Sequence, residues 1–455
     1  MAPSDPPRII EPGSELPSSP RLAGASSFRN APSPLSAGVS TLVGSAADGA
    51  FAVSEPRAAR RLENNANSSS RDQRRAARFG RRSALWRASL LPRLRKCGRT
   101  PIGSGVEIRH GEHGAGFGGV VTCGSVWACP CCSGKILAHR QDEIRGAVAA
   151  HLADPASGRQ LAMATLTIRH RKGDPLVVLW NAVSKAWAAV TSGKVWQRER
   201  DAHGLTGWLR VVEVTQGEHG WHVHVHALLF LDRADTSAGQ LTPGDLDVWQ
   251  RAIVGRWARA VERLGLHAPL PRAQDLHLIQ GDADPLAGYF TKAADNGIAQ
   301  AVALEFTRSA GKTGRTIGSR SPWGILDGVM ERDLDDLRLW HEYEKGSRGR
   351  RQITWSRGLR DALGLAPEQA DDEVAEGQDR TPLCQIDGDS WRRTTWSTPA
   401  LLPVMLDTAE ALVERHGAAV GAFELVRWLG TMGVVAWLPY QTRDPDPPPQ
   451  PQRSP

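Results

Sequence analysis

Histidines alternate with single valines in one short stretch of the chain. Residues 220–230 read GWHVHVHALLF and place His222, His224 and His226 two positions apart. Strict alternation has a period of two, so it predicts a β-strand with all three imidazoles on one face. Buried neutral histidines each need partners for two ring nitrogens, and one divalent cation satisfies several nitrogens at once. The stretch therefore predicts a metal site, and the alternative is a wet, half-exposed strand that happens to be rich in histidine.

Cysteines form a second group of candidate ligands. Cys129 and Cys132 make a C-x-x-C, a spacing that lets one tight turn present two thiolates to a tetrahedral ion. Cys123 lies six residues upstream, and Cys97 could provide the fourth sulfur, which leaves Cys131 as a spectator. A redox dithiol can share the C-x-x-C spacing, but no thioredoxin-like context surrounds this one. The cluster therefore predicts a structural zinc site.

A hairpin brings a carboxylate towards the histidines. Residues 208–215, WLRVVEVT, predict a strand, and QGEHG turns the chain so that the histidine strand follows it antiparallel. If residues 217–220 form a four-residue loop, Glu213 lies directly opposite His224, and opposed residues share a face of the sheet. A register shift of one residue would move Glu213 to the other face. Glu213 is thus a candidate third ligand, and the alternative is a carboxylate on a solvent face.

A helix with clear start and stop signals follows further along the chain. Asp284 is a candidate N-cap, Pro285 stands at the first helical position, and Gly297 ends the pattern. Tyr289 and Lys292 are three residues apart, so they share one face of this helix.

Periodicity predicts the elements that position these residues. A mixture of amphipathic helices and short strands indicates an α+β protein. The predicted helices are 135–151, 176–196, 246–264, 332–345, 402–416 and 423–429, and further strands are predicted at 161–170 and 277–280.

Composition limits the classes of protein. The 455 residues carry a formal charge of +7, which favours a polyanionic partner. No apolar run is long enough to span a membrane, and the N-terminal sequence lacks the pattern of a secretory signal. Clustered cysteines suit a reducing compartment, so we expect a cytoplasmic protein.

Two segments are strongly basic. Residues 71–96 hold ten basic side chains against a single acidic one, Asp72, which indicates either a solvated charged face or an arm that contacts phosphates. A second basic run surrounds Trp355, and we expect it to hold DNA through phosphates and an aromatic face. Its candidate DNA-binding residues are Arg348, Arg350, Arg351 and Arg357.

Several of these motifs, in this order, resemble those of a known family. The chain is similar to the rolling-circle replication initiators of actinobacterial plasmids, within the HUH superfamily of single-strand endonucleases. The resemblance covers roughly residues 90–365. It is carried by ATLTIRH, HVHVHALLF and GYFTK, together with the cysteine block and the later stretch WHEYEKGSRGRRQITWSRGLR.

The resemblance implies a role for each matched residue. His224 and His226 occupy the ligand positions of the family's metal site, and His222 occupies a common extra position. Tyr289 matches the nucleophile, and Lys292 matches the lysine of the Tyr-x-x-Lys motif. The implied cofactors are a divalent cation (Mn²⁺ or Mg²⁺) and a structural Zn²⁺.

The resemblance also implies an enzyme, a metal-dependent, site-specific DNA endonuclease and strand transferase. Such a protein nicks single-stranded DNA at the plasmid origin, forms a 5′-phosphotyrosine link and rejoins strands. Its expected partners are origin DNA, single-stranded or extruded as a hairpin, and a host helicase and DNA polymerase. A relaxase or single-tyrosine transposase would use the same chemistry. A zinc-stabilised DNA-binding repressor without enzymatic activity is the third interpretation.

The fold expected from the resemblance is an antiparallel, ferredoxin-like (HUH endonuclease) sheet with flanking helices. A Cys-rich, zinc-stabilised extension and a disordered N-terminus would precede it. The expected domains are a disordered segment (1–70), a basic arm with the Cys-rich region (71–150), a nickase domain (151–300), a basic accessory DNA-binding region (301–365), a linker (366–400) and a small helical C-terminal region (401–455).

Overall fold

The structure is a computed structural model, and it describes residues 57–233, 239–279, 319–377 and 380–439. The chain divides after Ala59 into two units, and the second, Arg60–Pro455, contains every described strand.

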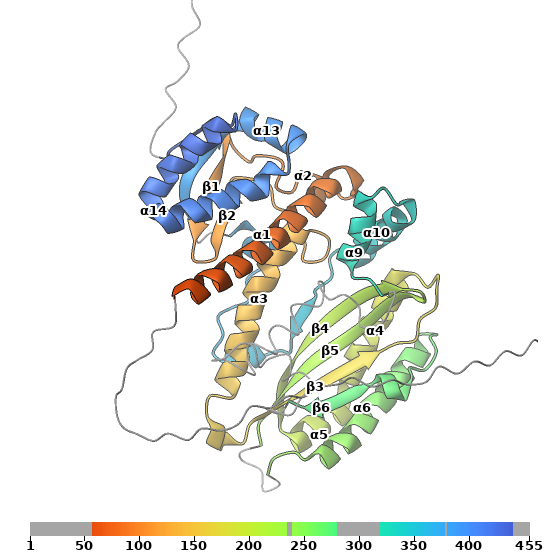
Figure 1. Ribbon diagram of the computed structural model, residues 1–455. Coiled ribbons are helices and arrows are strands. Elements are labelled where there is room, and N and C mark those ends of the chain that lie inside the picture. The colour runs from red at the N-terminus through yellow and green to blue at the C-terminus, as the bar shows by residue number, and fades with distance from the viewer. Residues whose placement is uncertain (1–56, 234–238, 280–318, 378–379, 440–455) are drawn as a thin grey trace, which may run out of the picture. The chain divides into compact units, whose positions relative to one another are not determined.

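The elements follow one another along the chain (Figure 1). The helices are α1 (Arg57–Ala88), α2 (Pro92–Lys96), α3 (Pro130–His151), α4 (Leu176–Val190), α5 (Gly193–His203), α6 (Pro243–Arg263), α9 (Pro322–Met330), α10 (Leu334–Ser347), α11 (Leu359–Ala362), α12 (Asp371–Glu376), α13 (Gly388–Ser397) and α14 (Leu401–Thr431). The strands are β1 (Gly105–Gly111), β2 (Gly114–Gly118), β3 (Gln160–Thr167), β4 (Leu205–Gly217), β5 (Gly220–Leu231), β6 (Asp275–Leu278), β7 (Ile353–Trp355), β8 (Thr381–Asp387) and β9 (Ala436–Trp437).

The larger sheet has five strands, in the order β6-β3-β5-β4-β7. Every neighbouring pair is antiparallel. The expected α+β class, with an antiparallel sheet and flanking helices, is therefore confirmed. The histidine strand β5 is the middle strand, so its backbone is paired on both sides and its register is fixed by two neighbours.

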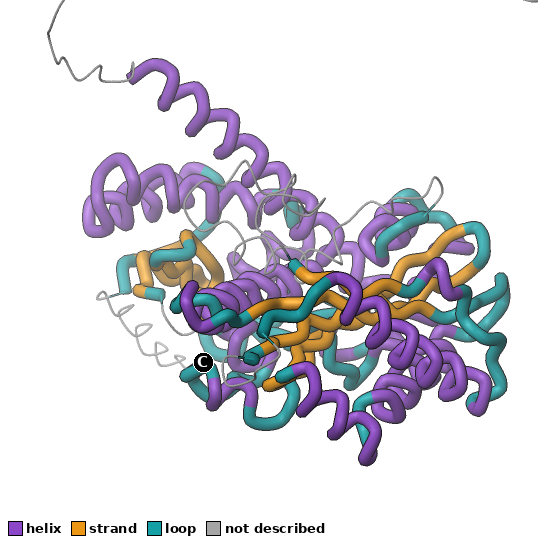
Figure 2. Tube along the Cα trace, turned by 90° about the horizontal axis from the view of Figure 1, so that it is seen from below, coloured by secondary structure: helices purple, strands orange, loops and turns teal. Residues whose placement is uncertain are grey.

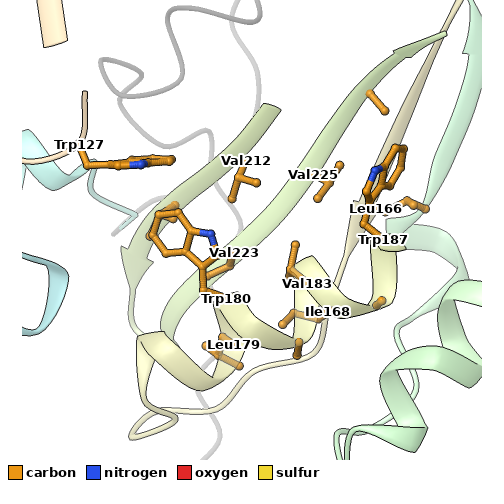
Figure 3. Close-up of a cluster of buried hydrophobic side chains, with 14 of the residues drawn as sticks. Trp127, Leu166, Ile168, Leu179, Trp180, Val183, Trp187, Val212, Val223 and Val225 are labelled. Carbon is orange, nitrogen blue, oxygen red and sulfur yellow. The ribbon is translucent and has the colours of Figure 1, made fainter. Parts of the chain in front are cut away.

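One face of this sheet is covered by helix α4. The helix presents Leu179, Trp180 and Val183 to the sheet, where Val212 and Val225 are fully buried with them (Figure 3). Burial of each such side chain stabilises the fold by about 1.5–3 kcal/mol. The valines between the histidines thus pack on the face of the sheet that α4 covers. Because side chains alternate along a strand, the imidazoles lie on the opposite face.

The opposite face is covered in part by helix α3. Ile144 and Val148 of this helix pack against Leu161, Leu228 and Phe230. Helices consequently lie on both sides of the layer of strands (Figure 2). The apolar cluster under α3 occupies the end of β5 beyond the histidines, so it borders the polar part of the same face.

A second sheet has four strands, in the order β2-β1-β8-β9. Its centre pairs segments that are far apart in the sequence, since Val106 faces Ile386. The expectation of a linker is therefore wrong for one segment. The expected linker 366–400 holds α12, β8 and α13, and the Cys-rich region contributes two strands to a sheet that the C-terminal part completes. The physical reason is that β1 needs a partner on each edge, and the second edge is supplied by β8.

Other boundaries also differ from the expectation. Helix α1 begins at Arg57, so residues 57–70 are helical, whereas residues 1–56 lie outside the described part of the chain. The helix predicted at 176–196 is two helices, because Gly193 adopts a φ of 80° that interrupts the pattern. The two predicted C-terminal helices are joined in α14 across a kink at Gly417. The proposed accessory region 301–365 also contributes to the core, because β7 pairs with β4 and Trp340 is fully buried.

None of the described helices combines the length and apolar character that a membrane span requires.

The role of β8 as a core strand is testable. Ile386 is fully buried and Thr381 on the same strand is exposed. Ile386→Ala should lower the free energy of unfolding by about 2–5 kcal/mol, because it leaves a cavity in the second core. The matched variant Thr381→Ala should stay within about 0.5 kcal/mol of the parent. Urea denaturation followed by circular dichroism measures both, and equal small effects would mean that 366–400 is a linker after all.

Candidate metal centres

The first candidate centre is created by the register of the β4–β5 hairpin. Glu213 pairs with His224, and Val211 pairs with His226, as the parity of the hairpin loop predicts. The pairing continues to Gly217 and Gly220, so the turn is two residues shorter than expected with the same parity. Glu213, His224 and His226 therefore share one face of the sheet.

Ligand atoms of these three residues converge on one point. The Glu213 Oε2 lies 2.8 Å from the His224 Nε2 and 3.5 Å from the His226 Nε2, and the two Nε2 atoms are 3.1 Å apart. An ion with ligand bonds of about 2.1 Å and angles of about 90–110° separates its ligand atoms by about 3.0–3.4 Å. The spacing and the donor set, two imidazoles and one carboxylate, thus fit a divalent cation.

Burial strengthens the electrostatics of this cluster. Glu213 is only 7% exposed and His224 only 9%. Burial alone would raise the pKa of the Glu213 carboxyl, but hydrogen bonds from the His224 and His226 imidazoles, with their charge, outweigh it and hold the pKa well below its usual range. A buried carboxylate of this kind stays ionised and is available to a cation.

A neighbouring strand supplies a residue that sequence reasoning did not assign to the site. Thr165 of β3 pairs with His226, and its Oγ1 lies 3.0 Å from the His226 Nδ1. A bond at Nδ1 orients the ring, so that Nε2 points at Glu213 and His224. The threonines alternate in ATLTIRH, which places Thr165 and Thr167 on the histidine face. This pattern could have identified Thr165 from the sequence.

His222 lies beside this group and is not part of it. Its ring stacks on the His224 ring at 4.7 Å and lies 5.2 Å from the His170 ring. The described residues whose ligand atoms lie within 4.8 Å of one another at this site are Glu213, His224 and His226. Burial, followed by the charges of His224 and His170, lowers the pKa of His222 to about 3, so its imidazole is neutral at physiological pH.

The second candidate centre consists of four cysteines. The sulfur of Cys97 is 3.6 Å from those of Cys129 and Cys132, and the sulfur of Cys123 is 3.6 Å from that of Cys132. A tetrahedral ion with metal–sulfur bonds of about 2.3 Å separates its sulfurs by about 3.8 Å. None of the four forms a disulfide. The structure therefore brings together the four predicted cysteines in a geometry that suits one tetrahedral ion.

The local fold explains why these thiols are close. Cys129 is the N-cap of α3, and its sulfur accepts a hydrogen bond from the backbone N–H of Cys132 at 3.5 Å. The N-terminal end of a helix stabilises a thiolate. Hydrogen bonds from Cys123 and Cys129 hold the pKa of Cys132 well below its usual range. Hydrogen bonds with Cys123 and Cys132 instead raise the pKa of Cys129. Four adjacent thiols cannot all ionise alone, and a bound cation removes that conflict.

Cationic side chains surround the cysteines. Arg82 is buried beside them, and although burial lowers its pKa, the charges of the thiolates outweigh this effect and raise it. Lys135 donates to the Ala375 carbonyl at 2.7 Å. Cys131 points away from the four sulfurs and donates to the Arg78 carbonyl at 3.7 Å, as expected of the spectator.

The predicted basic residues behave in two ways. Arg348, Arg351 and Arg357 are exposed. Arg350 is used inside the protein, because it donates to Asn181 at 2.8 Å and to the Gly346 carbonyl at 2.6 Å, and its guanidinium lies over Trp180. The first basic segment is also mostly structural in α1, where Arg75 forms ion pairs with Asp407 and Glu410.

The chain has three tyrosines, and the structure describes one of them. Tyr343 is fully buried, burial raises its pKa, and its hydroxyl donates to the Trp127 carbonyl at 3.3 Å. It is therefore a core residue that no substrate can reach. Tyr289, Lys292 and Tyr440 lie outside the described residues.

Comparison with known proteins identifies relatives of this chain. A family model described as "Replication protein" matches residues 119–237, which include three of the four cysteines and the hairpin of the first centre. A curated protein from Streptomyces lividans, "Protein rep", is 30% identical over 342 residues, which cover 61% of this chain and 73% of that relative. A "Neomycin resistance protein" from Streptomyces cyanogenus is 30% identical over 176 residues, covering 31% of this chain and 39% of that relative. No solved structure matches the chain.

The bond between Thr165 and His226 gives a test of the first centre. Thr165→Val keeps the shape of the side chain and removes the hydroxyl, so the affinity for Mn²⁺ should fall by about 10- to 100-fold. Thr215→Val is the matched control, because Thr215 pairs with His222 outside the convergent group. Mn²⁺ titration followed by electron paramagnetic resonance measures both affinities. Equal losses in the two variants would show that the site is not centred on His226.

Proposed function

This chain belongs to the replication-protein (Rep) family of actinobacterial plasmids, and from that premise we propose that it starts plasmid replication by nicking and rejoining DNA at the origin. The proposed reaction is a metal-dependent strand transfer with a tyrosine nucleophile, and the proposed fold of the catalytic sheet is that of the HUH endonucleases.

One observation carries the proposal. The Glu213 Oε2 and the Nε2 atoms of His224 and His226 converge within a buried patch of the matched region. A DNA-binding protein without catalytic activity has no need for this arrangement, because a buried carboxylate and two imidazoles are costly to gather. Because the protein would supply only three ligands, a cation bound there would have further coordination positions for phosphate oxygens.

The chemistry follows from the residue types. A divalent cation bound there would polarise the scissile phosphate as a Lewis acid. Its ligand set favours Mn²⁺ over Mg²⁺, because Mg²⁺ prefers oxygen ligands. Glu213 would supply the negative charge that retains the cation, and Thr165 holds the His226 ring in the orientation that presents Nε2.

Tyr289 is the proposed nucleophile. Its phenolic oxygen would bond to the phosphorus while the bond from phosphorus to the 3′ oxygen breaks, which leaves a 5′-phosphotyrosine and a free 3′-hydroxyl. Because the new bond is also a phosphodiester, a strand can later be rejoined. Lys292 would place a positive charge beside the phosphate or the phenolate. A host polymerase and helicase would then act on the free 3′-hydroxyl and the opened duplex.

The segment between Ile279 and Tyr289 is long enough for Tyr289 to reach the proposed metal site. The backbone N–H of Ile279 donates to the Leu161 carbonyl at 2.8 Å, which fixes the chain beside β3. The metal-site end of β3, at Thr165, lies about 13 Å from Leu161 at the usual rise of a strand. The ten residues that follow Ile279 span at most about 35 Å when extended, so Tyr289 is within reach of the site.

We also propose that the four cysteines hold one structural Zn²⁺. Cys97, Cys123, Cys129 and Cys132 match the sulfur spacing of a tetrahedral zinc site. Zinc binding contributes folding free energy directly when ligands come from separate segments.

The nucleophile is tested with a fluorescent single-stranded oligonucleotide of the origin, incubated with protein and Mn²⁺. The parent should form a covalent adduct that persists on a denaturing gel. Tyr289→Phe should abolish the adduct and leave DNA affinity within a few fold, because only one oxygen is lost. Tyr440→Phe, the chemically matched control, should keep full adduct formation. An adduct with Tyr289→Phe would assign the nucleophile elsewhere.

The zinc proposal is tested by metal analysis of purified protein. The parent and Cys131→Ser should each contain about one zinc per chain, whereas Cys129→Ser should contain none and be less stable. His224→Ala should retain the zinc, because its metal site is separate. If the zinc disappears in His224→Ala and persists in Cys129→Ser, the two centres have been exchanged in our assignment.

A further inference from the structure

A tryptophan lies exposed at the end of α13 between basic side chains. Trp396 is 64% exposed, whereas the other tryptophans among the described residues are buried or half-buried. Two guanidinium groups lie over its ring, that of Arg99 at 4.9 Å and that of Arg87 at 5.9 Å from the centroid. A single exposed apolar side chain is ordinary on a protein surface, but an exposed aromatic ring set among cations is a feature of surfaces that bind single-stranded nucleic acid.

Two adjoining hollows connect this ring to helix α2. One, of about 260 Å³, is lined by Arg87, Arg99 and Trp396, among others. The next, of about 310 Å³, shares Trp86 and Arg99 with the first and extends to Arg95 and Lys96. We define the Trp396 surface as the exposed residues Arg87, Arg95, Lys96 and Trp396 together with the half-buried Arg99.

Every charged side chain of the Trp396 surface is positive. No carboxylate lines either hollow. Among the described residues, the four cations of this surface form no ion pair with an acidic side chain, in contrast to Arg75 and Arg81 on the same helix as Arg87. Four uncompensated cations beside an exposed ring match a polyanion that also carries flat apolar groups.

Hydrogen bonds from two buried tryptophans fix the backbone that carries the Trp396 surface. The Trp391 indole N–H donates to the Arg99 carbonyl at 2.9 Å, and Trp391 is fully buried. The Trp86 indole N–H donates to the Cys97 carbonyl at 2.9 Å, directly after Lys96. Cys97 also belongs to the four-cysteine centre. The cations and the ring are therefore presented by a rigid base, which limits the entropy lost on binding.

We propose that the Trp396 surface binds single-stranded DNA at a site separate from the nicking centre. One base would stack on the Trp396 ring, and the four cations would contact phosphates on either side of it. Bases inside a duplex are stacked on each other, so only an unpaired base can use the ring in this way. The choice of DNA rests on membership of the replication-protein family, and the inference would stand for a member that binds origin DNA without cutting it.

The test is fluorescence anisotropy of a short fluorescein-labelled oligothymidylate with the full chain, without Mn²⁺. Trp396→Ala should weaken binding by about tenfold, because stacking on one base is lost. Trp396→Phe, which keeps a ring, should recover most of the affinity. Phe423→Ala is the matched control, since Phe423 is a similarly exposed aromatic residue on α14.

The cations are tested through the dependence on salt. Arg95→Ala should reduce the slope of log affinity against log salt concentration by about 0.7, because one phosphate contact is lost. Arg338→Ala, at an exposed arginine on α10 paired with Asp335, should leave the slope unchanged.

Three results would overturn the proposal. They are parental affinity in Trp396→Ala, an equal loss in Phe423→Ala, and tighter binding of a duplex or of oligouridylate than of oligothymidylate. The nicking proposal is judged independently. A parent that forms no covalent adduct but loses affinity on Trp396→Ala would contradict nicking and support this surface.

Discussion

The register of the β4–β5 hairpin is the constraint on which the first centre depends. It places Glu213 opposite His224, and the alternation of β5 then brings His226 to the same face. A shift by one residue would place the carboxylate among the valines that α4 buries, where it would meet no cation. The register is fixed from both sides, because β3 pairs with the other edge of β5, with Thr165 facing His226. Packing of Val223 and Val225 on the face covered by α4 thus determines that the ligand atoms meet on the other face.

Helix α3 links the two candidate centres. Cys129 is its N-cap and Cys132 lies in its first turn, and its later turns pack Ile144 and Val148 on the histidine face of the large sheet. The cysteines also fix the chain at Cys97, directly after the basic helix α2. A metal bound by the four sulfurs would therefore stabilise three segments that converge from different parts of the sequence. That arrangement is consistent with a structural role for the cysteine centre and a chemical role for the histidine centre.

Local patterns predicted much of the larger sheet. Alternation identified β5, loop parity identified the partner of His224, and the C-x-x-C with two further cysteines identified the second centre. The smaller sheet was not predicted, because Val106 meets Ile386 only in the folded chain and β8 is flanked by acidic and polar residues. Arg350 was assigned to DNA from its basic neighbours, although its guanidinium packs on Trp180 and bonds Asn181. Sequence composition does not reveal which basic side chains pack inside the fold. It also does not reveal that Trp396 is exposed beside Arg87 and Arg99, because these residues meet only in the folded chain.

The central claim is that Glu213, His224 and His226 hold one divalent cation that activates a phosphate. The most direct measurement is anomalous X-ray diffraction, at the manganese edge, from crystals of the protein grown with Mn²⁺ and a short single-stranded oligonucleotide. The account predicts one peak about 2.0–2.3 Å from the Glu213 Oε2 and from both Nε2 atoms, with a phosphate oxygen in an open position. An absent peak at these three side chains, with manganese bound elsewhere beside the DNA, would contradict it.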